Sequence, residues 1–579
     1  SEFDTFDIRT SQNYSWPRES SYSNGSHDTM VREVWCRETL GAMGQPYRRS
    51  RYYHLYLNGQ YWGLYETDER PEASYGETYF GGDKEDYDVV KCANHVGNFV
   101  TEVTDGNFNS FSNLWTMARA LATDAGNANY FRILGRNADG SRNPALPVML
   151  DVDNLIDYML EIFYSGDGDA TLSAFLSNTR PNNWFGMMNR NDPDTGYRFF
   201  NSDAEHTLGA PSSQVDRTGP FGGLAGSNIG NFTYANPQYI HEDLMRNPEY
   251  RLRFADHVQK HFFNGGALTF EQCTNRWYRK AAQIDQAVRA YSARWGDAVR
   301  EPPYNENDWR FMINNVVTTF FTNRGGIVLQ QLATDNLFPA VAAPAFNHYG
   351  GFITPEFTLS MNQTNPAGTI YFTLDGTDPR LVGGAISGNA QVYAAPVSLG
   401  GNAHVRARVK VGDVWSPQID ATYTSAEYFR DLVVTEIMYN PPGTIAPPVD
   451  GDEFEFLEIK NTGGETLNLS GLSFTSGITF AFTNGTQLEP GNFFVLARNA
   501  VQFAARYPGV TVNGVYSGRL DNGGETLRLT HLIGGQVFAV SYDDSIPWPL
   551  APDGHGFSLV PVNDGTDPNS DNGLHWRAS

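Results

Sequence analysis

The chain has 579 residues and a formal net charge of −24. A chain of this length is expected to fold as several domains, and so acidic a balance argues against nucleic acid as a partner. Its three cysteines are widely spaced, which excludes a disulfide-dense scaffold and argues against a cysteine zinc site while leaving room for one disulfide. No apolar run is long enough to span a bilayer.

Residues 1–130 combine short strands with polar loops. Residues 51–70, RYYHLYLNGQYWGLYETDER, alternate around Asn58-Gly59, a dipeptide that predicts a β-hairpin, and Glu69 follows its second strand. Residues 86–91, DYDVVK, form another predicted strand that ends at Lys91. A short helix is predicted over residues 32–40, and helical periodicity returns in residues 110–135 and 240–335.

The segment between residues 151 and 209 is the most informative part of the chain. Apolar residues recur at helical spacing after Asp151, which is a suitable N-cap, and the helix should end at Gly166. The loop that follows carries Asp167 and Asp169. A short apolar strand, residues 197–200, then leads to a second acidic cluster. Because each cluster follows a regular element, we expect both to lie at one metal that prefers oxygen ligands, Mg²⁺ or Mn²⁺.

That second cluster consists of Asp203 and Glu205, and a buried strand directly before such acids implies a partner for them. Residues 209–237 are rich in Gly, Ser and Asn and are predicted to form a long loop. The strand-rich front half and the helical back half together predict an α+β domain with two lobes.

All-β patterns dominate the rest of the chain. Short alternating strands after about residue 340 predict one small β-sandwich, and regularly spaced strands after about residue 430 predict a second. The predicted domains are therefore residues 1–338, 339–426 and 427–579, and we expect the chain to continue beyond residue 579.

Several of these segments carry a resemblance to known families. The motifs LNGQYWGLYE, LDVDNLIDYMLEIFY, GDGDA, PNNWFGMMNR and SDAEHTLG occur in this order and resemble the spore coat protein H (CotH) kinase family over about residues 1–335. IYFTLDGTDP, residues 370–379, resembles the small β-sandwich at the C-terminus of chitobiase-type enzymes. The segment from VVTEIMYNPP to LNLSGLSF resembles the lamin-tail domain, an immunoglobulin-like sandwich found on many secreted bacterial proteins.

The CotH resemblance implies an atypical protein-kinase-like fold that transfers the γ-phosphoryl group of ATP, with Mg²⁺ or Mn²⁺, to Ser or Thr of secreted proteins. In that family pattern Asp169 is the catalytic carboxylate, and Asp203 with Glu205 and Asn183 holds the metal. Lys91 would contact the phosphates and Glu69 would orient it. The resemblance also implies a secreted or cell-surface bacterial protein whose partners are secreted proteins or envelope components, with polysaccharide as a further ligand of the β-domains.

One departure from the family pattern stands out. The family places the catalytic Asp and the supporting Asn about one helical turn apart, whereas here TLSAFLSNTRP separates Asp169 from Asn183, and Asn178 is a competing candidate. This favours a second hypothesis, in which the domain is a catalytically degenerate structural or adhesive component of a bacterial envelope or extracellular assembly.

Residue patterns alone leave other readings open. Asp167 and Asp169 also suit a turn or a structural Ca²⁺ site, a lysine at a strand end such as Lys91 is usually solvated, and His206 is expected to be a packed loop histidine rather than a ligand. We expect a turn at DGTDP, residues 375–379, and a solvated loop with Ca²⁺ as the minority reading for the acidic residues 450–455.

Overall fold

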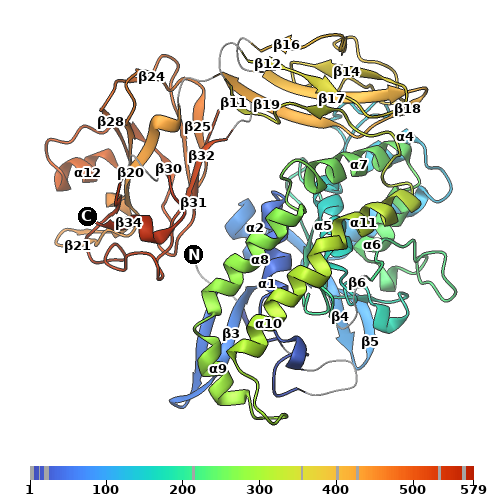
Figure 1. The fold of residues 1–579 in the computed structure, drawn as a ribbon, viewed down its shortest axis with the longest axis horizontal. Coiled ribbons are helices and arrows are strands. Elements are labelled where there is room, and N and C mark those ends of the chain that lie inside the picture. The colour runs from blue at the N-terminus through green and yellow to red at the C-terminus, as the bar shows by residue number, and fades with distance from the viewer. Residues whose placement is uncertain are drawn as a thin grey trace.

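The computed structural model describes residues 6–11, 13–18, 25–210, 215–353, 357–399, 403–425, 429–531, 536–563 and 569–579. Figure 1 shows a mixed helical and stranded region followed by two β-rich regions. Three large apolar cores correspond to them, spanning Trp16–Leu337, Phe346–Tyr423 and Phe429–Trp576. The chain is therefore multidomain, as predicted, although the individual domain boundaries stay predictions.

The first sheet contains the predicted hairpin. Its strands are β1 (Phe6–Arg9), β3 (Gln60–Glu69) and β2 (Tyr52–Leu57), in that order. Asn58 and Gly59 have φ of 51° and 79°, the left-handed pair that a tight two-residue turn requires. The N-terminal strand pairs antiparallel with β3, which places Arg9 opposite Glu66.

The second sheet has the order β5-β4-β8-β9. Its strands are β4 (Tyr87–His95), β5 (Asn98–Asp105), β8 (Trp184–Asn189) and β9 (Arg198–Asn201). The predicted strand at residues 86–91 is confirmed but extends four residues further, because a turn at Val96-Gly97 folds it into a hairpin with β5. One face of the sheet joins the largest core and the other packs under α2 (Ala73–Phe80).

The helices surround a central helix, α5 (Val152–Ser165), whose residues are almost all buried. Asp151 accepts a hydrogen bond from the Asn154 backbone N–H at 3.1 Å, and Gly166, with φ of 67°, ends the helix, so both predicted boundaries are confirmed. The others are α1 (Arg32–Ala42), α3 (Asn109–Ala120), α4 (Asn127–Ile133), α6 (Pro237–Leu244), α7 (Pro248–Phe262), α8 (Phe270–Ile284), α9 (Val288–Trp295), α10 (Glu306–Val316) and α11 (Thr322–Thr334).

The long polar segment before α6 is a loop, as predicted. Of its described residues before α6, 209–210 and 215–236, only Phe232–Tyr234 form a helical turn. Glu242 of α6 accepts hydrogen bonds from the backbone N–H groups of Phe221 and Gly222, each at 2.7 Å, and so fixes the loop to the helical core.

The first β-rich region has a five-strand sheet path, β11-β19-β17-β14-β15. The strands are β11 (Gly351–Ile353), β14 (Thr369–Thr373), β15 (Gln391–Val392), β17 (Ala403–Val411) and β19 (Ile419–Ser425), with β18 (Val414–Trp415) beside β17. Two short pairs complete it, β10 (Ala345–Phe346) with β13 (Met361–Asn362) and β12 (Thr358–Leu359) with β16 (Val397–Ser398). The DGTDP segment is a turn, as expected: Asp375 accepts from the Thr377 backbone N–H at 2.9 Å.

The last region contains two larger sheets that share one core. The first runs β29 (Gly514–Val515), β28 (Phe493–Ala497), β23 (Phe456–Asn461), β20 (Leu432–Met438), β33 (Leu559–Pro561), β34 (Trp576–Ala578). The second runs β30 (Ser517–Gly518), β26 (Ile478–Ala481), β25 (Leu472–Ser476), β31 (Thr526–His531), β32 (Gln536–Ser541). The regular strand spacing therefore predicted a β-rich region correctly, and α12 (Ala500–Arg506) is the one α-helix among its described elements.

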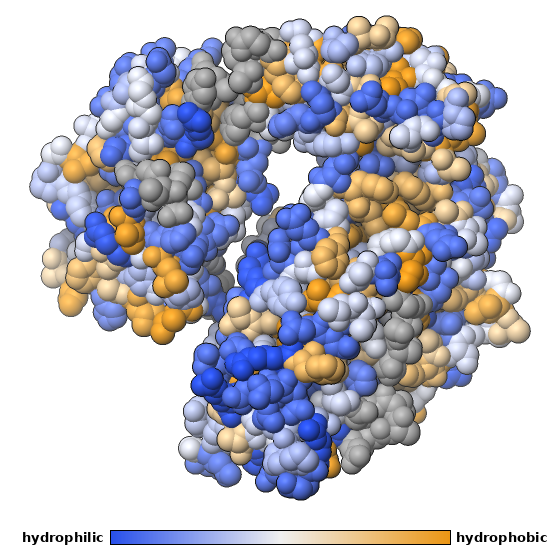
Figure 2. Space-filling model, in the orientation of Figure 1, coloured by the Kyte–Doolittle hydropathy of each residue, from blue (hydrophilic) through white to orange (hydrophobic). Residues whose placement is uncertain are grey.

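Ion pairs connect the three regions. Arg380 and Arg408 of the first β-rich region bind Glu249 and Asp256 of α7 through both oxygens of each carboxylate, at 2.6 to 2.8 Å. Arg51, just before β2, reaches Asp544 of the last region at 3.0 Å. The last region of the chain therefore contacts the first, and Figure 2 shows the opening between the three regions.

Candidate active site

The two predicted acidic clusters lie beside each other. Asn154 of α5 accepts a hydrogen bond from the Phe199 backbone N–H at 2.6 Å, which couples the helix to β9. Beyond the helix, the Gly168 N–H donates to the His206 carbonyl at 3.0 Å, and the Leu208 N–H donates to the Ser165 carbonyl at 2.8 Å. Two segments about 35 residues apart in sequence are thereby held together by the backbone itself.

Asp169 is held by three polar side chains. Ser173 donates to one carboxylate oxygen, and Asn182 and Asn183 donate to the other at 3.1 and 3.2 Å. Burial raises the pKa of Asp169 despite these donors, and the negative charge of Asp203 raises it further. The carboxylate is therefore fixed in orientation and more basic than a solvated one.

The residues between Asp169 and Asn183 form a small hairpin. Strand β6 (Thr171–Leu172) pairs antiparallel with β7 (Pro181–Asn182), with Thr171 opposite Asn182. This pairing returns the chain to its starting point, so the departure from the family spacing leaves Asn183 in contact with Asp169. Asn178, the competing candidate, lies away from it and accepts from Arg217 at 2.6 Å.

Asp167 has a different role. Its side chain is 1% exposed, and one oxygen accepts from the Asp169 backbone N–H at 2.9 Å. Burial raises its pKa well above the usual range. It shapes the loop that presents Asp169.

Asp203 and Glu205 meet a third carboxylate that the sequence did not point to. One oxygen each of Glu33, Asp203 and Glu205 lies within 4.8 Å of the others, and we call these three residues the acidic triad. Asn183, predicted as a metal ligand with the two acids, lies against Asp169 instead. Glu33 comes from the first turn of α1, where an acid is ordinarily a solvated partner of the helix dipole, so its sequence position gave no signal.

The acidic triad concentrates negative charge in a largely buried place. Burial, followed by the charges of Asp203 and Glu33, raises the pKa of Glu205 to about 8. The Asn13 backbone N–H, at 2.8 Å, and its side-chain amide donate to Glu205. The Arg9 guanidinium lies 2.5 Å from Asp203 and 3.2 Å from Glu33. Arg9 thus supplies one positive charge that partly balances the carboxylates of the acidic triad.

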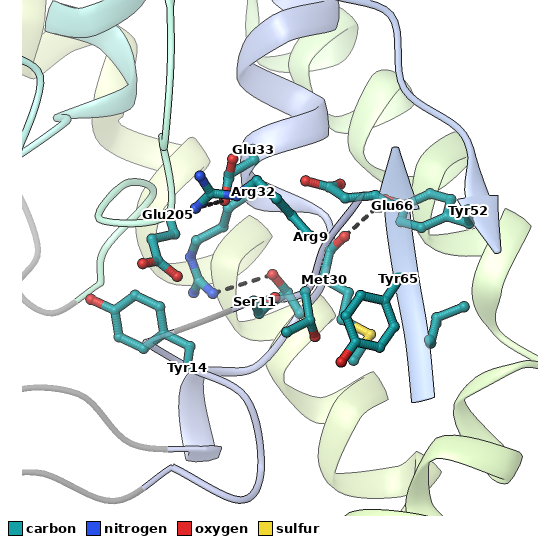
Figure 3. Close-up of a pocket in the computed structure, with 13 residues that line it drawn as sticks. Arg9, Ser11, Tyr14, Met30, Arg32, Glu33, Tyr52, Tyr65, Glu66 and Glu205 are labelled. Carbon is teal, nitrogen blue, oxygen red and sulfur yellow. Dashed lines mark hydrogen bonds and ion pairs between the residues drawn. The ribbon is translucent and has the colours of Figure 1, made fainter. Parts of the chain in front are cut away.

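A pocket adjoins the acidic triad. Figure 3 shows Arg9, Arg32, Glu33, Glu205 and Tyr14 converging on it from β1, the segment after β1, α1 and the loop after β9. Arg32 is buried and donates to the Thr207 carbonyl at 3.0 Å and to Thr29 at 3.2 Å, and burial lowers its pKa to about 10. The site therefore pairs carboxylates with two arginines, neither of which the sequence analysis selected.

His206 is a packed loop histidine, as expected. Its Nδ1 lies 2.7 Å from the Tyr14 hydroxyl, and its ring contacts Phe175 with centroids 4.8 Å apart. It supports the segment that carries Asp203 and Glu205.

Lys91 and Glu69 do not form the predicted pair. Lys91 Nζ lies 3.6 Å from Glu102 of the neighbouring strand and 5.9 Å from the centroid of the Phe185 ring. Glu69 belongs to the other sheet and accepts from the Arg49 backbone N–H at 2.7 Å and from the Tyr79 hydroxyl. The side chain of Lys91 lies on the face of its sheet that packs under α2, the same face as Phe185. The next residue, Cys92, points to the opposite face, where its thiol contacts the Pro181 carbonyl at 3.2 Å.

Two further sequence candidates were a disulfide and the acidic segment 450–455. The three cysteines are free, so the disulfide that the sequence left room for is absent from the described residues. In the acidic segment 450–455, Asp452 pairs with Arg498 at 3.1 Å and with Arg519 at 3.5 Å. Glu455 is buried and accepts from the Leu520 backbone N–H at 2.8 Å. This segment is thus organised by arginines and backbone amides.

Glu161 of α5, behind the site, gives a prediction about pH. It is 1% exposed, and burial raises its pKa to about 7. Because the folded-state pKa lies above the unfolded one, its contribution to stability is full below about pH 4.5 and is lost as the pH rises towards 7. Glu161→Gln should therefore gain about 2–3 kcal/mol relative to the wild type between pH 4.5 and 8.

Native-state hydrogen exchange of peptides from α5, in both proteins and at the two pH values, measures this difference. Glu77→Gln, an exposed substitution on α2, is the control and should change little. A Glu161→Gln effect that is the same at both pH values would contradict the prediction.

Comparison with known proteins adds three family matches. A family model described as CotH kinase protein matches residues 20–325, one described as Fn3 associated matches residues 358–414, and one described as Lamin Tail Domain matches residues 425–544. The middle model carries a different name from the chitobiase-type module that the sequence resembles.

No curated protein matches the chain. A crystal structure of a DUF4876 family protein from Bacteroides thetaiotaomicron is 9% identical and covers 39% of this chain and 94% of its own, with a TM-score of 0.19, which is too low to carry an argument about the fold. Among the described residues, no helix combines the length and apolar character needed to cross a membrane.

Proposed function

The chain belongs to the CotH kinase family, whose model spans 306 of its 579 residues, and on that premise we propose that it is a protein kinase. In this proposal it transfers the γ-phosphoryl group of ATP to a Ser or Thr hydroxyl of a protein substrate, with Mg²⁺ or Mn²⁺. The observation that carries the proposal is the juxtaposition of an oriented carboxylate, Asp169, with the acidic triad at the adjoining ends of α5 and β9. Phosphoryl transfer needs positioning and charge neutralisation, and this arrangement suits both.

The acidic triad suits a hard divalent cation. Its donors are three carboxylate oxygens, the ligands that Mg²⁺ and Mn²⁺ prefer, and burial together with the charges of Asp203 and Glu33 raises the pKa of Glu205. In the proposal Glu33, Asp203 and Glu205 hold the metal, with Asn183 supporting Asp169. A metal bound there would neutralise charge on the phosphates of the nucleotide.

Asp169 would orient the acceptor hydroxyl and accept its proton. Its raised pKa makes it a better base, and the donors Ser173, Asn182 and Asn183 keep its carboxylate in one orientation. This assignment follows the family position of the residue and the contacts that hold it.

The cations for the phosphates are proposed to be Arg9 and Arg32, which line the pocket beside the acidic triad. Guanidinium groups suit phosphate oxygens because they offer several donors in a planar fork. The contributions of Lys91 and Glu69 stay predictions from the family pattern, since their observed partners are other residues.

We further propose a secreted or cell-surface location in a bacterium, because the CotH and lamin-tail matches are consistent with it. Secreted proteins or envelope components would then be the substrates. Polysaccharide binding by the β-rich regions is a subsidiary hypothesis, and a pull-down with chitin or peptidoglycan tests it.

Metal-dependent ATP binding tests the kinase proposal directly. Asp203→Asn and Glu205→Gln should each weaken ATP binding in the presence of Mg²⁺ by at least about tenfold, because each removes one charged ligand. Calorimetric titration with ATP, with and without Mg²⁺ or Mn²⁺, measures the effect. Asp413→Asn removes a fully exposed carboxylate and is the matched control.

Wild-type protein that binds no ATP with either metal would overturn the proposal. It would favour the alternative of a degenerate structural component, which formation of filaments or lattices unaffected by Asp203→Asn would support.

A further inference from the structure

A second group of metal-binding side chains lies between α5 and α7. Arg253, His257 and His261 occupy successive turns of α7, and Asp153 and Asp157 occupy successive turns of α5, so the two rows face each other. His257 Nδ1 is 2.6 Å from an Asp157 oxygen, and His261 Nε2 is 3.0 Å from the same oxygen. The ligand atoms of Asp157, His257 and His261 converge within 4.8 Å.

We propose that Asp157, His257 and His261 bind a zinc-class transition metal ion. Two imidazoles at i and i+4 with a carboxylate on the facing helix form a nitrogen and oxygen donor set suited to Zn²⁺, and a fourth position remains for water. Tetrahedral ligands bound at about 2.0–2.1 Å lie roughly 3.3 Å apart, close to the observed separations. Small side-chain adjustments would therefore admit the ion.

The position of His261 supports this proposal independently. Its side chain is 3% exposed, and its Nε2 approaches Asp157 to 3.0 Å. The pair nevertheless lacks hydrogen-bond geometry, so this buried nitrogen has no hydrogen-bond partner among the described residues. Two ligand atoms that lie this close without a hydrogen bond between them can both point at a third position, and we propose that a metal ion binds there.

The surrounding contacts resemble the outer shell of a metal site. His257 Nε2 lies 2.9 Å from Asp153, which Arg253 fixes with two bonds of 2.7 Å. The other oxygen of Asp157 accepts from Gln45 Nε2 at 2.7 Å. Carboxylates that hold the distal nitrogen of a ligating imidazole, and donors that fix a ligating carboxylate, are the partners metal ligands require.

Charge and access also fit a divalent cation. Asp157 supplies a negative charge to the ion, Asp153 being paired with Arg253, and His257 is 13% exposed, so solvent reaches the group from its side. The ion would join α5, which leads into the loop of Asp169, to α7, which carries the first β-rich region through Glu249 and Asp256. The site is separate from the acidic triad and does not depend on the proposed kinase activity.

Zinc titration of untagged, chelator-stripped protein tests the proposal. We expect one equivalent of Zn²⁺ per chain, a higher melting temperature with zinc, and the visible absorption bands of tetrahedral Co²⁺ when cobalt replaces it. The double variant His257→Gln/His261→Gln should lose both the binding and the thermal shift. Asp153→Asn changes a partly exposed residue outside the ligand set and should weaken zinc binding about 10–100-fold. This variant tests the proposal even if the double variant does not fold.

Two control variants locate the ion. His95→Gln removes an exposed histidine elsewhere and Asp203→Asn alters the acidic triad, so both should retain the zinc equivalent. Wild-type protein without stoichiometric zinc or cobalt binding, or unchanged binding in Asp153→Asn, would overturn the proposal. ATP titration in Mg²⁺ remains a separate measurement, so failure here leaves the kinase proposal to its own test.

Discussion

Asp169→Asn is expected to lower kcat for phosphoryl transfer by about 10²–10⁴-fold, the typical contribution of a positioned general base. An amide has the shape of the carboxylate and can still meet Ser173 and Asn182, but it cannot accept the proton of the acceptor hydroxyl. Metal-dependent ATP affinity should stay within about threefold, because Asp169 lies outside the acidic triad.

Steady-state phosphorylation of a peptide or of the chain itself, together with ATP calorimetry, separates the two effects. Asp167→Asn is the informative comparison two residues away. This carboxyl is buried, burial raises its pKa, and its amide replacement can still accept from the Asp169 backbone N–H, so we expect a much smaller loss. Equal activity of Asp169→Asn and the wild type would remove Asp169 from the catalytic role.

The sequence predicted the elements of the site better than its contacts. Helix α5, strand β9 and the hairpin at Asn58-Gly59 followed from periodicity, capping and turn chemistry, which are local properties. Glu33 joins Asp203 and Glu205 only because α1 packs against the segment after β9, with Arg32 bound to the Thr207 carbonyl. A carboxylate in the first turn of a helix carries no mark of such a distant partner.

The inserted segment before Asn183 shows the same limit. Read along the chain, it separates two side chains that the family pattern keeps close. In the structure, the pairing of Thr171 with Asn182 closes the excursion, and residues with positive φ, including Asn178 at 55°, turn the chain within it. Sequence distance therefore overestimated the spatial separation of Asp169 and Asn183.

The opposite error occurred at Lys91 and Glu69. The sequence predicted Lys91 at the end of one strand and Glu69 just past another, and the family pattern made them partners. The strand order places them in different sheets, β5-β4-β8-β9 and β1-β3-β2, and the hairpin of β4 with β5 supplies Glu102 directly opposite Lys91. The sequence pattern did not predict β5, so Glu102 was not expected opposite Lys91.

Arg408→Met is expected to release the first β-rich region from α7. The Arg408 side chain is 2% exposed and its guanidinium binds both oxygens of Asp256 and of Asp378 at 2.7 to 2.9 Å. Its removal leaves two carboxylates facing each other without a cation. Since both acids are partly exposed and solvent screens them, we expect a loss of about 2–3 kcal/mol rather than the larger cost of a fully buried pair.

Native-state hydrogen exchange measures this loss locally, which suits a multidomain chain without a single unfolding transition. In Arg408→Met, peptides from β17 and α7 should exchange faster, while those from β20 and β23 stay unchanged. Arg406→Met on the same strand is the control, because Arg406 is 32% exposed and pairs with the exposed Asp420, an interaction worth about 1 kcal/mol or less. Equal effects of the two variants would show that α7 and the β-rich region are held by packing rather than by the buried guanidinium.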